Sequence, residues 1–159
     1  MRPPATAPSL PASRCARSVQ LDADDSAPAR AALGRAALGR AGERLALTHL
    51  VQVHGLVLVA TTLRVAVEDL RGELDVVVRD PRSGTLVVCE VKTRTGSVAG
   101  GALAAFGPQQ QARIRRMTAV LLASGQLQGR RVRFDLITVD VASPQPGADV
   151  RLDHLPDAW

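Results

Sequence analysis

Lysine is almost absent from this chain. Of its 20 basic residues, Lys92 is the only lysine, and arginine carries all the other positive side-chain charge. Arginine stays protonated at any useful pH, whereas lysine is a compact point charge whose pKa changes with burial. One ammonium group retained in so arginine-rich a sequence indicates a position where an ammonium is needed, for example to hold a nucleophilic water. Retention by chance is the alternative.

Aromatic residues and cysteine are also scarce. Two phenylalanines, one tryptophan and no tyrosine leave little material for stacking bases, the usual means of binding single strands. Cys15 in the N-terminal part and Cys89 in an apolar run predict two reduced thiols rather than a disulfide or a metal site. His49, His54 and His154 lack metal-ligand spacing, and we interpret them as helix or tail residues.

Long apolar runs are missing as well. No run reaches the roughly 18 residues of a membrane-spanning helix, and the N-terminus lacks the apolar stretch of a secretory signal. We therefore expect a cytoplasmic protein without a membrane partner. The formal net charge is +5 over 159 residues, and residues 37–140 carry this excess because the charges of the two ends cancel. A basic core favours a polyanionic partner, although such a charge is also typical of a solubilising surface.

The pattern of apolar and turn residues predicts one α/β domain with flanking segments. Residues 1–36, rich in Pro, Ala, Ser and Arg, predict a disordered leader. The domain covers residues 37–141, and residues 142–159 form a tail that can add one edge strand near Val150. The expected elements are a helix from near Leu38 to Gly55, strands over 56–63, 72–79 and 85–92, a helix from Pro108 to about Ser124, and a strand over 130–141.

Alternation along the strands predicts a cluster of charged side chains. Successive residues of a strand point to opposite faces, so Glu90 and Lys92 share one face of the third strand, as Glu73 and Asp75 do on the second. A hairpin in suitable register brings Asp75, Glu90 and Lys92 together at one end of the sheet. Two carboxylates, a backbone carbonyl and a substrate phosphate form a plausible shell for a hard cation such as Mg²⁺, with Lys92 orienting the attacking water.

A simpler interpretation of these residues stays open. Asp75 can end a strand at a solvated surface, while Glu90 and Lys92 form an exposed ion pair that stabilises by only about 0.2 to 1 kcal/mol. As a bare pattern, E-x-K is weak. Its surroundings favour a functional role, because a charged pair that directly follows Leu86-Val87-Val88-Cys89 is costly to bury without an ion.

Four ordered blocks stand out between Leu38 and Val141. They are Gly39-Arg40-Ala41-Gly42-Glu43, Gly72-Glu73-Leu74-Asp75, Val88-Cys89-Glu90-Val91-Lys92-Thr93-Arg94 and Arg133-Phe134-Asp135-Leu136. Together they contain three of the four glutamates and the only lysine. In this order the blocks resemble the YraN-like proteins, an uncharacterised group with a restriction-endonuclease-like, PD-(D/E)xK fold. The resemblance implies an α/β fold in which a mixed sheet, in the order α-β-β-β-α-β, is flanked by helices.

The resemblance also implies roles for individual residues. Asp75 and Glu90 match the metal ligands of the nuclease superfold and Lys92 its catalytic lysine, with Mg²⁺ or Mn²⁺ as the cofactor. Glu43 is similar to the additional helix carboxylate of the Holliday-junction-resolvase branch, where it completes the metal site. A carboxylate stabilised by the helix dipole is the alternative for Glu43. Glu73 is the weaker ligand candidate.

Several residues are candidates for contact with a nucleic-acid backbone. The family usually carries a lysine after the proline that opens the second helix, where this chain has Gln110, which keeps hydrogen bonding but loses a charge. Arginines on the same helix can restore that charge, although a solvated basic face explains them equally well. Arg133 either pairs with Asp135 or contacts phosphate. The full candidate set is Arg94, Gln110, Arg113, Arg116 and Arg133.

The sequence therefore predicts a divalent-metal-dependent nuclease that hydrolyses phosphodiester bonds of DNA rather than RNA. Branched or damaged DNA is a candidate substrate class, and no small-molecule substrate is expected. Because resolvase-like members act as dimers on two-fold substrates, a homodimer is a further expectation. Two alternatives remain: a non-catalytic nucleic-acid-binding or scaffold module that keeps the fold, and a protein-interaction domain whose acidic face binds a structural cation.

Overall fold

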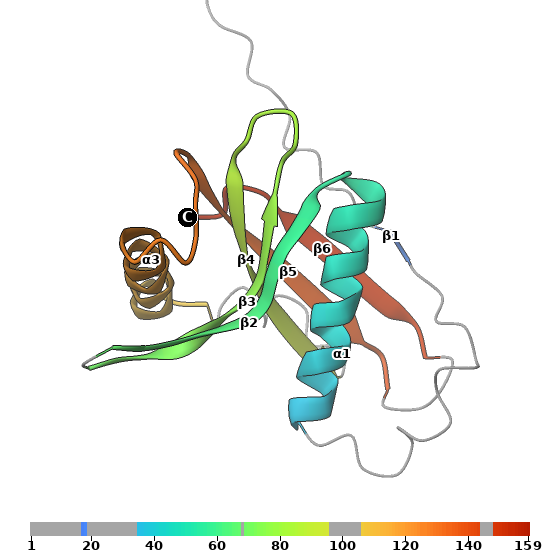
Figure 1. Cartoon of the computed structure of the whole chain (residues 1–159). Coiled ribbons are helices and arrows are strands. Elements are labelled where there is room, and N and C mark those ends of the chain that lie inside the picture. The colour runs from blue at the N-terminus through green and yellow to red at the C-terminus, as the bar shows by residue number, and fades with distance from the viewer. Residues whose placement is uncertain (1–16, 19–34, 68, 96–105, 144–147) are drawn as a thin grey trace, which may run out of the picture.

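The computed structural model describes residues 17–18, 35–67, 69–95, 106–143 and 148–159 (Figure 1). Nearly all of the predicted leader, and residues 96–105, lie outside this part of the chain. Within it, no helix has the length and apolar character needed to cross a lipid bilayer. The elements are β1 (Arg17–Ser18), α1 (Arg35–Thr48), η2 (His49–Val53), β2 (Val57–Val67), β3 (Leu70–Arg79), β4 (Leu86–Thr95), α3 (Pro108–Ala123), β5 (Val132–Val141) and β6 (Val150–Leu155).

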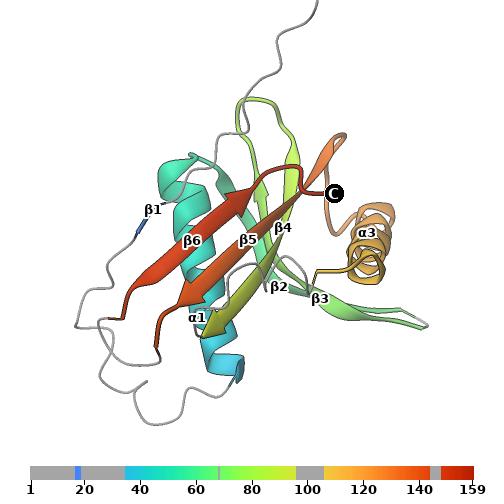
Figure 2. The same ribbon diagram turned by 180° about the vertical axis from the view of Figure 1, so that it is seen from behind.

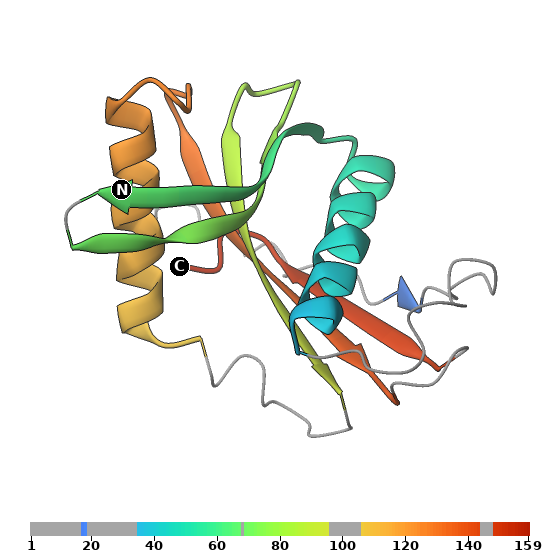
Figure 3. The ribbon, with the colours of Figure 1, turned by 60° about the horizontal axis from the view of Figure 1, so that its bottom comes forward.

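The strands form one mixed sheet in the order β1-β6-β5-β4-β3-β2. Strands β4 and β5 run parallel, and the other neighbours are antiparallel. A parallel pair needs a crossover connection, which here contains α3. Figures 2 and 3 show that α1 and α3 lie on opposite sides of the sheet. The predicted α/β class and the order α-β-β-β-α-β are confirmed, and the arrangement is consistent with a restriction-endonuclease-like fold.

Each face of the sheet packs its own hydrophobic core. On one side, Ala46 of α1 packs in a buried cluster that includes Cys89 of β4. On the other side, Ile114 of α3 packs in a second cluster that includes Val88. Because neighbouring residues of β4 belong to different clusters, the strand alternates as the sequence predicts. Glu90 is in phase with Val88 and therefore lies on the α3 side.

The aromatic residues of the chain meet in the α3-side core. The ring centroids of Phe106 and Trp159 are 4.4 Å apart, and those of Phe134 and Trp159 are 5.6 Å apart. The backbone N–H of Ala158 donates to the carbonyl of Phe134 at 2.8 Å and fixes the last residues against β5. Residues predicted to form a tail thus complete the core, and these rings pack on one another rather than forming a row of stacking platforms.

The first helix begins at Arg35 and ends in a π-helical turn, η2. Gly55 follows in the left-handed conformation, with φ of 66°, and its N–H donates to the Val51 carbonyl at 3.1 Å. Glycine adopts this φ without a steric penalty, which explains the predicted stop at this position. In a π-helix the hydrogen bonds span five residues, so His49 and His54 come to the same side of the chain.

Helix α1 approaches β4 closely at Gly42. A Cβ atom at this position would overlap the hydroxyl of Thr93 and lie 2.9 Å from the Thr93 Cβ. A Cβ at Gly39, three residues earlier on the same helix, would meet no atom within 4 Å. The contact between α1 and the sheet therefore requires glycine at one of these two positions only.

Substitution of Gly42 by alanine should lower the free energy of unfolding by about 1 to 3 kcal/mol, because the added methyl group pushes α1 away from Thr93. The matched control Gly39→Ala should raise it by up to about 1 kcal/mol, since alanine is the better helix former. Urea unfolding followed by circular dichroism measures both changes. Equal effects of the two substitutions would contradict the close approach.

Candidate active site

Asp75 interrupts the pairing of β3 on both of its sides. The β2–β3 pairing passes from Val76 to Leu74 and skips Asp75, while the β3–β4 pairing stops at Val76. The strands separate here, and the Asp75 carboxylate (Oδ2) accepts a hydrogen bond from the backbone N–H of Val91 at 2.8 Å. A side chain thus satisfies a backbone donor that the ladder leaves unpaired.

Opposite this gap, β2 is locally strained at Thr62. Its φ of 50° lies in the left-handed region, which a β-branched residue rarely adopts. Such conformations cost on the order of 1 to 3 kcal/mol and cluster at functional sites. Burial raises the pKa of Glu43 on α1, and the Thr62 side chain lies close enough to its carboxylate to oppose that effect. The distortion therefore connects α1 to the end of the sheet where Asp75 lies.

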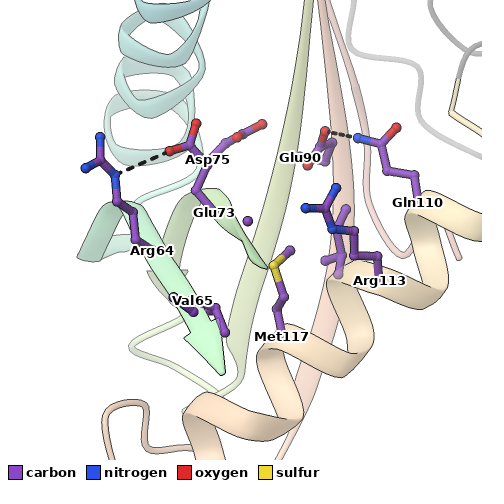
Figure 4. Close-up of a pocket in the computed structure, with 11 residues that line it drawn as sticks. Arg64, Val65, Glu73, Asp75, Glu90, Gln110, Arg113 and Met117 are labelled. Carbon is purple, nitrogen blue, oxygen red and sulfur yellow. Dashed lines mark hydrogen bonds and ion pairs between the residues drawn. The ribbon is translucent and has the colours of Figure 1, made fainter. Parts of the chain in front are cut away.

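Glu90 and Lys92 form a tight pair beside Asp75, in a position that side-chain alternation predicts. The carboxylate of Glu90 is buried, and its Oε1 atom accepts a hydrogen bond from Lys92 Nζ at 2.5 Å. The same atom accepts a second hydrogen bond from Gln110 Nε2 at 2.6 Å (Figure 4). Because the described residues donate to Oε1 alone, Oε2 can bind another group. The ammonium of Lys92 has three N–H groups, so two remain after the contact with Glu90.

Burial and, after it, neighbouring negative charge raise the pKa of two carboxyl groups at this end of the sheet. Burial and, after it, the charge of Glu90 raise the pKa of Asp75 to about 7, against the opposing hydrogen bond from Val91. Burial and, after it, the charge of Glu73 raise the pKa of Glu43. A cation placed among these carboxylates would offset both effects.

The donor set fits a hard divalent cation that has few protein ligands. Carboxylate oxygens suit Mg²⁺ or Mn²⁺, and Mg²⁺ usually keeps several waters beside one or two carboxylates. Among the described residues, no three carboxylates are placed to hold one metal ion together. Asp75 and Glu90, each with one oxygen that accepts no hydrogen bond from this part of the chain, therefore suit a two-carboxylate shell, with Glu43 as a further negative charge nearby.

A cleft of about 490 Å³ opens beside these carboxylates. Asp75 and Glu90 contribute to its lining from the sheet, Arg64 from β2, and Gln110 and Arg113 from α3. Figure 4 shows the α3 side chains directed toward the strands. The guanidinium of Arg113 donates to the backbone carbonyl of Arg71, which holds it at the cleft wall. Arginines in this position are suited to contact a phosphate.

The other predicted backbone-binding residues lie outside the cleft lining. Arg116 pairs with Asp69 at 3.7 Å, and both side chains are exposed. Arg133 was expected either to pair with Asp135 or to contact phosphate. It donates two hydrogen bonds of 2.8 Å to the buried Asp135, so the structure contains the ion pair. Arg94 lies two positions after Lys92 on β4 and therefore on the same face of the strand.

Gln110 has a partner that the sequence did not indicate. The sequence makes it a candidate for phosphate contact in place of a lysine. In the structure its amide donates a hydrogen bond to the Glu90 carboxylate, and the residue also lines the cleft. The three histidines are a second unexpected constellation, since each ring brings one nitrogen within 4.8 Å of the other two. Their spacing alone does not reveal this contact, because it depends on the π turn and on the pairing of β6.

The model of the uncharacterised protein family UPF0102 matches residues 42–139. This segment begins at Gly42 of α1, ends at Val139 of β5, and includes the charged residues of the candidate site. The matched part thus contains the strands on which α1 and α3 pack, and every element from β2 to α3.

Similar proteins with the name UPF0102 protein occur in several bacteria. The protein from Bordetella avium is 42% identical over 91 residues, or 57% of this chain and 59% of that protein, so the match spans less than two thirds of its length. The protein from Mycolicibacterium smegmatis is 40% identical over 114 residues, or 72% of this chain and 86% of that protein. The protein from Frankia casuarinae is 44% identical over 88 residues, 55% and 70% of the two chains.

Replacing Asp75 by asparagine should make stability less sensitive to pH. Because the pKa of Asp75 is about 7 in the folded chain and near 4 when unfolded, the wild type loses stability as pH rises from about 4 to 7. The amide oxygen of an asparagine would accept from the Val91 N–H without carrying a charge. We expect the variant's advantage in free energy of unfolding to grow over this range to on the order of 2 to 4 kcal/mol.

Urea unfolding between pH 4 and 8 in EDTA tests this expectation. The matched control is Asp153→Asn, which removes a carboxylate from β6, and its difference from wild type should not grow in the same way. Adding Mg²⁺ at pH 8 should stabilise the wild type more than Asp75→Asn, since the variant lacks one carboxylate charge. A pH-independent difference between Asp75→Asn and wild type would refute the electrostatic account.

Proposed function

We propose that this chain, which belongs to the uncharacterised protein family UPF0102, that of the YraN-like proteins, is a divalent-metal-dependent nuclease that hydrolyses phosphodiester bonds of DNA. One observation carries the proposal: Asp75, Glu90 and Lys92 converge on one face of the sheet beside a cleft lined by arginines. Carboxylates, an ammonium and phosphate-binding groups together are the components that hydrolysis of a phosphodiester needs.

Arginine side chains hold the substrate backbone in this proposal. Arg113 and Arg64 lie on the cleft lining, where a phosphate can approach them. Contacts with phosphate are independent of base sequence, and none of the described residues that line the cleft is an aromatic that could stack a base. The preferred substrate is therefore distinguished by the shape of its backbone, which makes branched or damaged DNA the first class to examine.

Asp75 and Glu90 would hold Mg²⁺ or Mn²⁺ through the oxygens left after their bonds to Val91, Lys92 and Gln110. The bound cation would supply positive charge where negative charge develops on the phosphoryl oxygens. Gln110 keeps the Glu90 carboxylate in one orientation.

Lys92 would position the attacking water with the N–H groups that Glu90 does not use. Its side chain is only 24% exposed, and Nζ lies 5.9 Å from the ring centroid of Phe106. Packing of this kind restricts the directions in which the ammonium can donate, which favours one orientation of the water.

A non-catalytic nucleic-acid-binding module is the second candidate function. It is favoured by the short Lys92–Glu90 pair, because an ion pair of 2.5 Å can serve structure alone. In this case the cleft would bind DNA through its arginines, and no bond would be hydrolysed. Cleavage assays separate the two candidates.

Duplex, single-stranded, flapped and four-way-junction DNAs should be incubated with the protein in Mg²⁺ or Mn²⁺. We expect cleavage of at least one substrate, and a loss of at least about a hundredfold in rate for Asp75→Asn and Lys92→Met, because each removes a group that acts on the transition state. Asp153→Asn is the matched control and should cleave like the wild type. Binding without cleavage, or equal cleavage by all variants, would overturn the nuclease proposal.

Replacing Arg113 by glutamine should weaken DNA binding equally for all sequences. Loss of one phosphate contact is expected to reduce the slope of log affinity against log salt concentration by about 1. Fluorescence anisotropy in EDTA at several salt concentrations measures the slope. The matched control is Arg151→Gln on β6, where the arginine pairs with Asp153 outside the cleft. Equal slopes for both variants would place the DNA elsewhere.

A further inference from the structure

The three histidines of the chain meet on the α1 side of the sheet. His49 opens η2, His54 follows it, and His154 lies on β6 opposite Ile137, a member of the α1-side core. The ring centroids are 4.7, 4.9 and 5.5 Å apart. His49 and His154 are buried, while His54 reaches the surface. Residues about a hundred positions apart thus present their rings to one another.

Hydrogen bonds among the rings account for the arrangement only in part. The Nε2 atom of His54 lies 3.0 Å from Nε2 of His49 and 3.3 Å from Nδ1 of His154. In a neutral imidazole each nitrogen carries either one hydrogen or one lone pair. A single proton on Nε2 of His54 therefore points to one neighbour at a time, whereas a metal ion between the rings would bind all three nitrogens together.

Asp135 fixes the orientation of His154. Its carboxylate is fully buried, forms an ion pair with Arg133 and lies 2.9 Å from Nε2 of His154. A carboxylate accepts hydrogen bonds, so Nε2 carries a proton and, in the neutral ring, Nδ1 presents its lone pair toward His54. Histidines that bind metals commonly donate their second N–H to a carboxylate in this way.

Two of the three nitrogen separations are close to those of a tetrahedral zinc site. Zinc–nitrogen bonds of about 2.0 to 2.1 Å at tetrahedral angles place ligand nitrogens roughly 3.3 to 3.4 Å apart. The two separations from Nε2 of His54, 3.0 and 3.3 Å, lie within a few tenths of an ångström of this range, and all three nitrogens lie within 4.8 Å of one another. Small side-chain movements are therefore enough to centre an ion, and the fourth position would face solvent beside His54.

We propose that His49, His54 and His154 bind a transition-metal ion of the Zn²⁺ type, with Asp135 as the positioning residue for His154. The ion joins the end of the first helix to β6. This site differs in chemistry from the carboxylate cleft, because imidazole nitrogens favour zinc and carboxylate oxygens favour Mg²⁺. The proposal does not depend on nuclease activity.

Calorimetric titration of the full, EDTA-treated chain with ZnCl₂ tests the site. We expect one Zn²⁺ per chain for the wild type, and an affinity at least tenfold lower for His54→Ala, whose exposed side chain can be removed without disturbing the core. The matched control Gln52→Ala removes an exposed side chain from the same π turn and should bind zinc like the wild type. Equal affinity of the two variants would overturn the proposal.

Two further measurements identify the ligands. Co²⁺ in place of zinc should give the intense visible bands of tetrahedral cobalt in the wild type and in Asp75→Asn, but not in His54→Ala. Zinc should raise the unfolding temperature of the wild type and of Gln52→Ala more than that of His54→Ala. Zinc binding that is lost in Cys15→Ser and retained in His54→Ala, or no binding by the wild type at micromolar zinc, would refute the site.

Discussion

The hydrogen bond between the Val91 N–H and the Asp75 carboxylate is the contact around which the candidate site is built. Strand β3 leaves β4 at this point and continues with β2 alone, so a backbone donor in the sheet loses its partner. Leaving that donor unsatisfied would be costly. Asp75 satisfies it from a buried position near Glu90, which raises its pKa to about 7. The contact that closes the gap in the ladder thus also concentrates negative charge where a cation would be stabilising.

The parallel pairing of β4 with β5 determines what each face of the sheet can do. Because the crossover carries α3 over one face, Glu90 meets Gln110 at the start of α3 and lines the cleft. Residues of the opposite phase face α1 and its π turn, where Asp135 of β5 reaches His154. Because side chains alternate along β4 and β5, the carboxylate cleft and the three histidines lie on opposite faces of the same sheet.

Local patterns in the sequence predicted most of the fold and the centre of the candidate site. Pro108, Gly55 and the alternating apolar residues act within a few positions, so the helix boundaries and the shared face of Glu90 and Lys92 were predictable. The left-handed conformation of Thr62 and the π turn after α1 were not predicted, because no residue pattern within either segment indicates them. The packing of Trp159 on Phe106 was missed for the same reason. Residues that act through distant partners carry no local pattern.

Gln110 shows how one such residue alters the charge balance of the site. Burial and, after it, neighbouring carboxylates raise the pKa of Glu43 and of Asp75, and the ammonium of Lys92 offsets only part of this negative charge. A lysine in place of Gln110 would satisfy the Glu90 oxygen with a second positive charge and reduce the attraction for a cation. Glutamine forms the same hydrogen bond without that charge, so the Glu90 carboxylate is held in place while the site keeps the negative potential that a divalent ion needs.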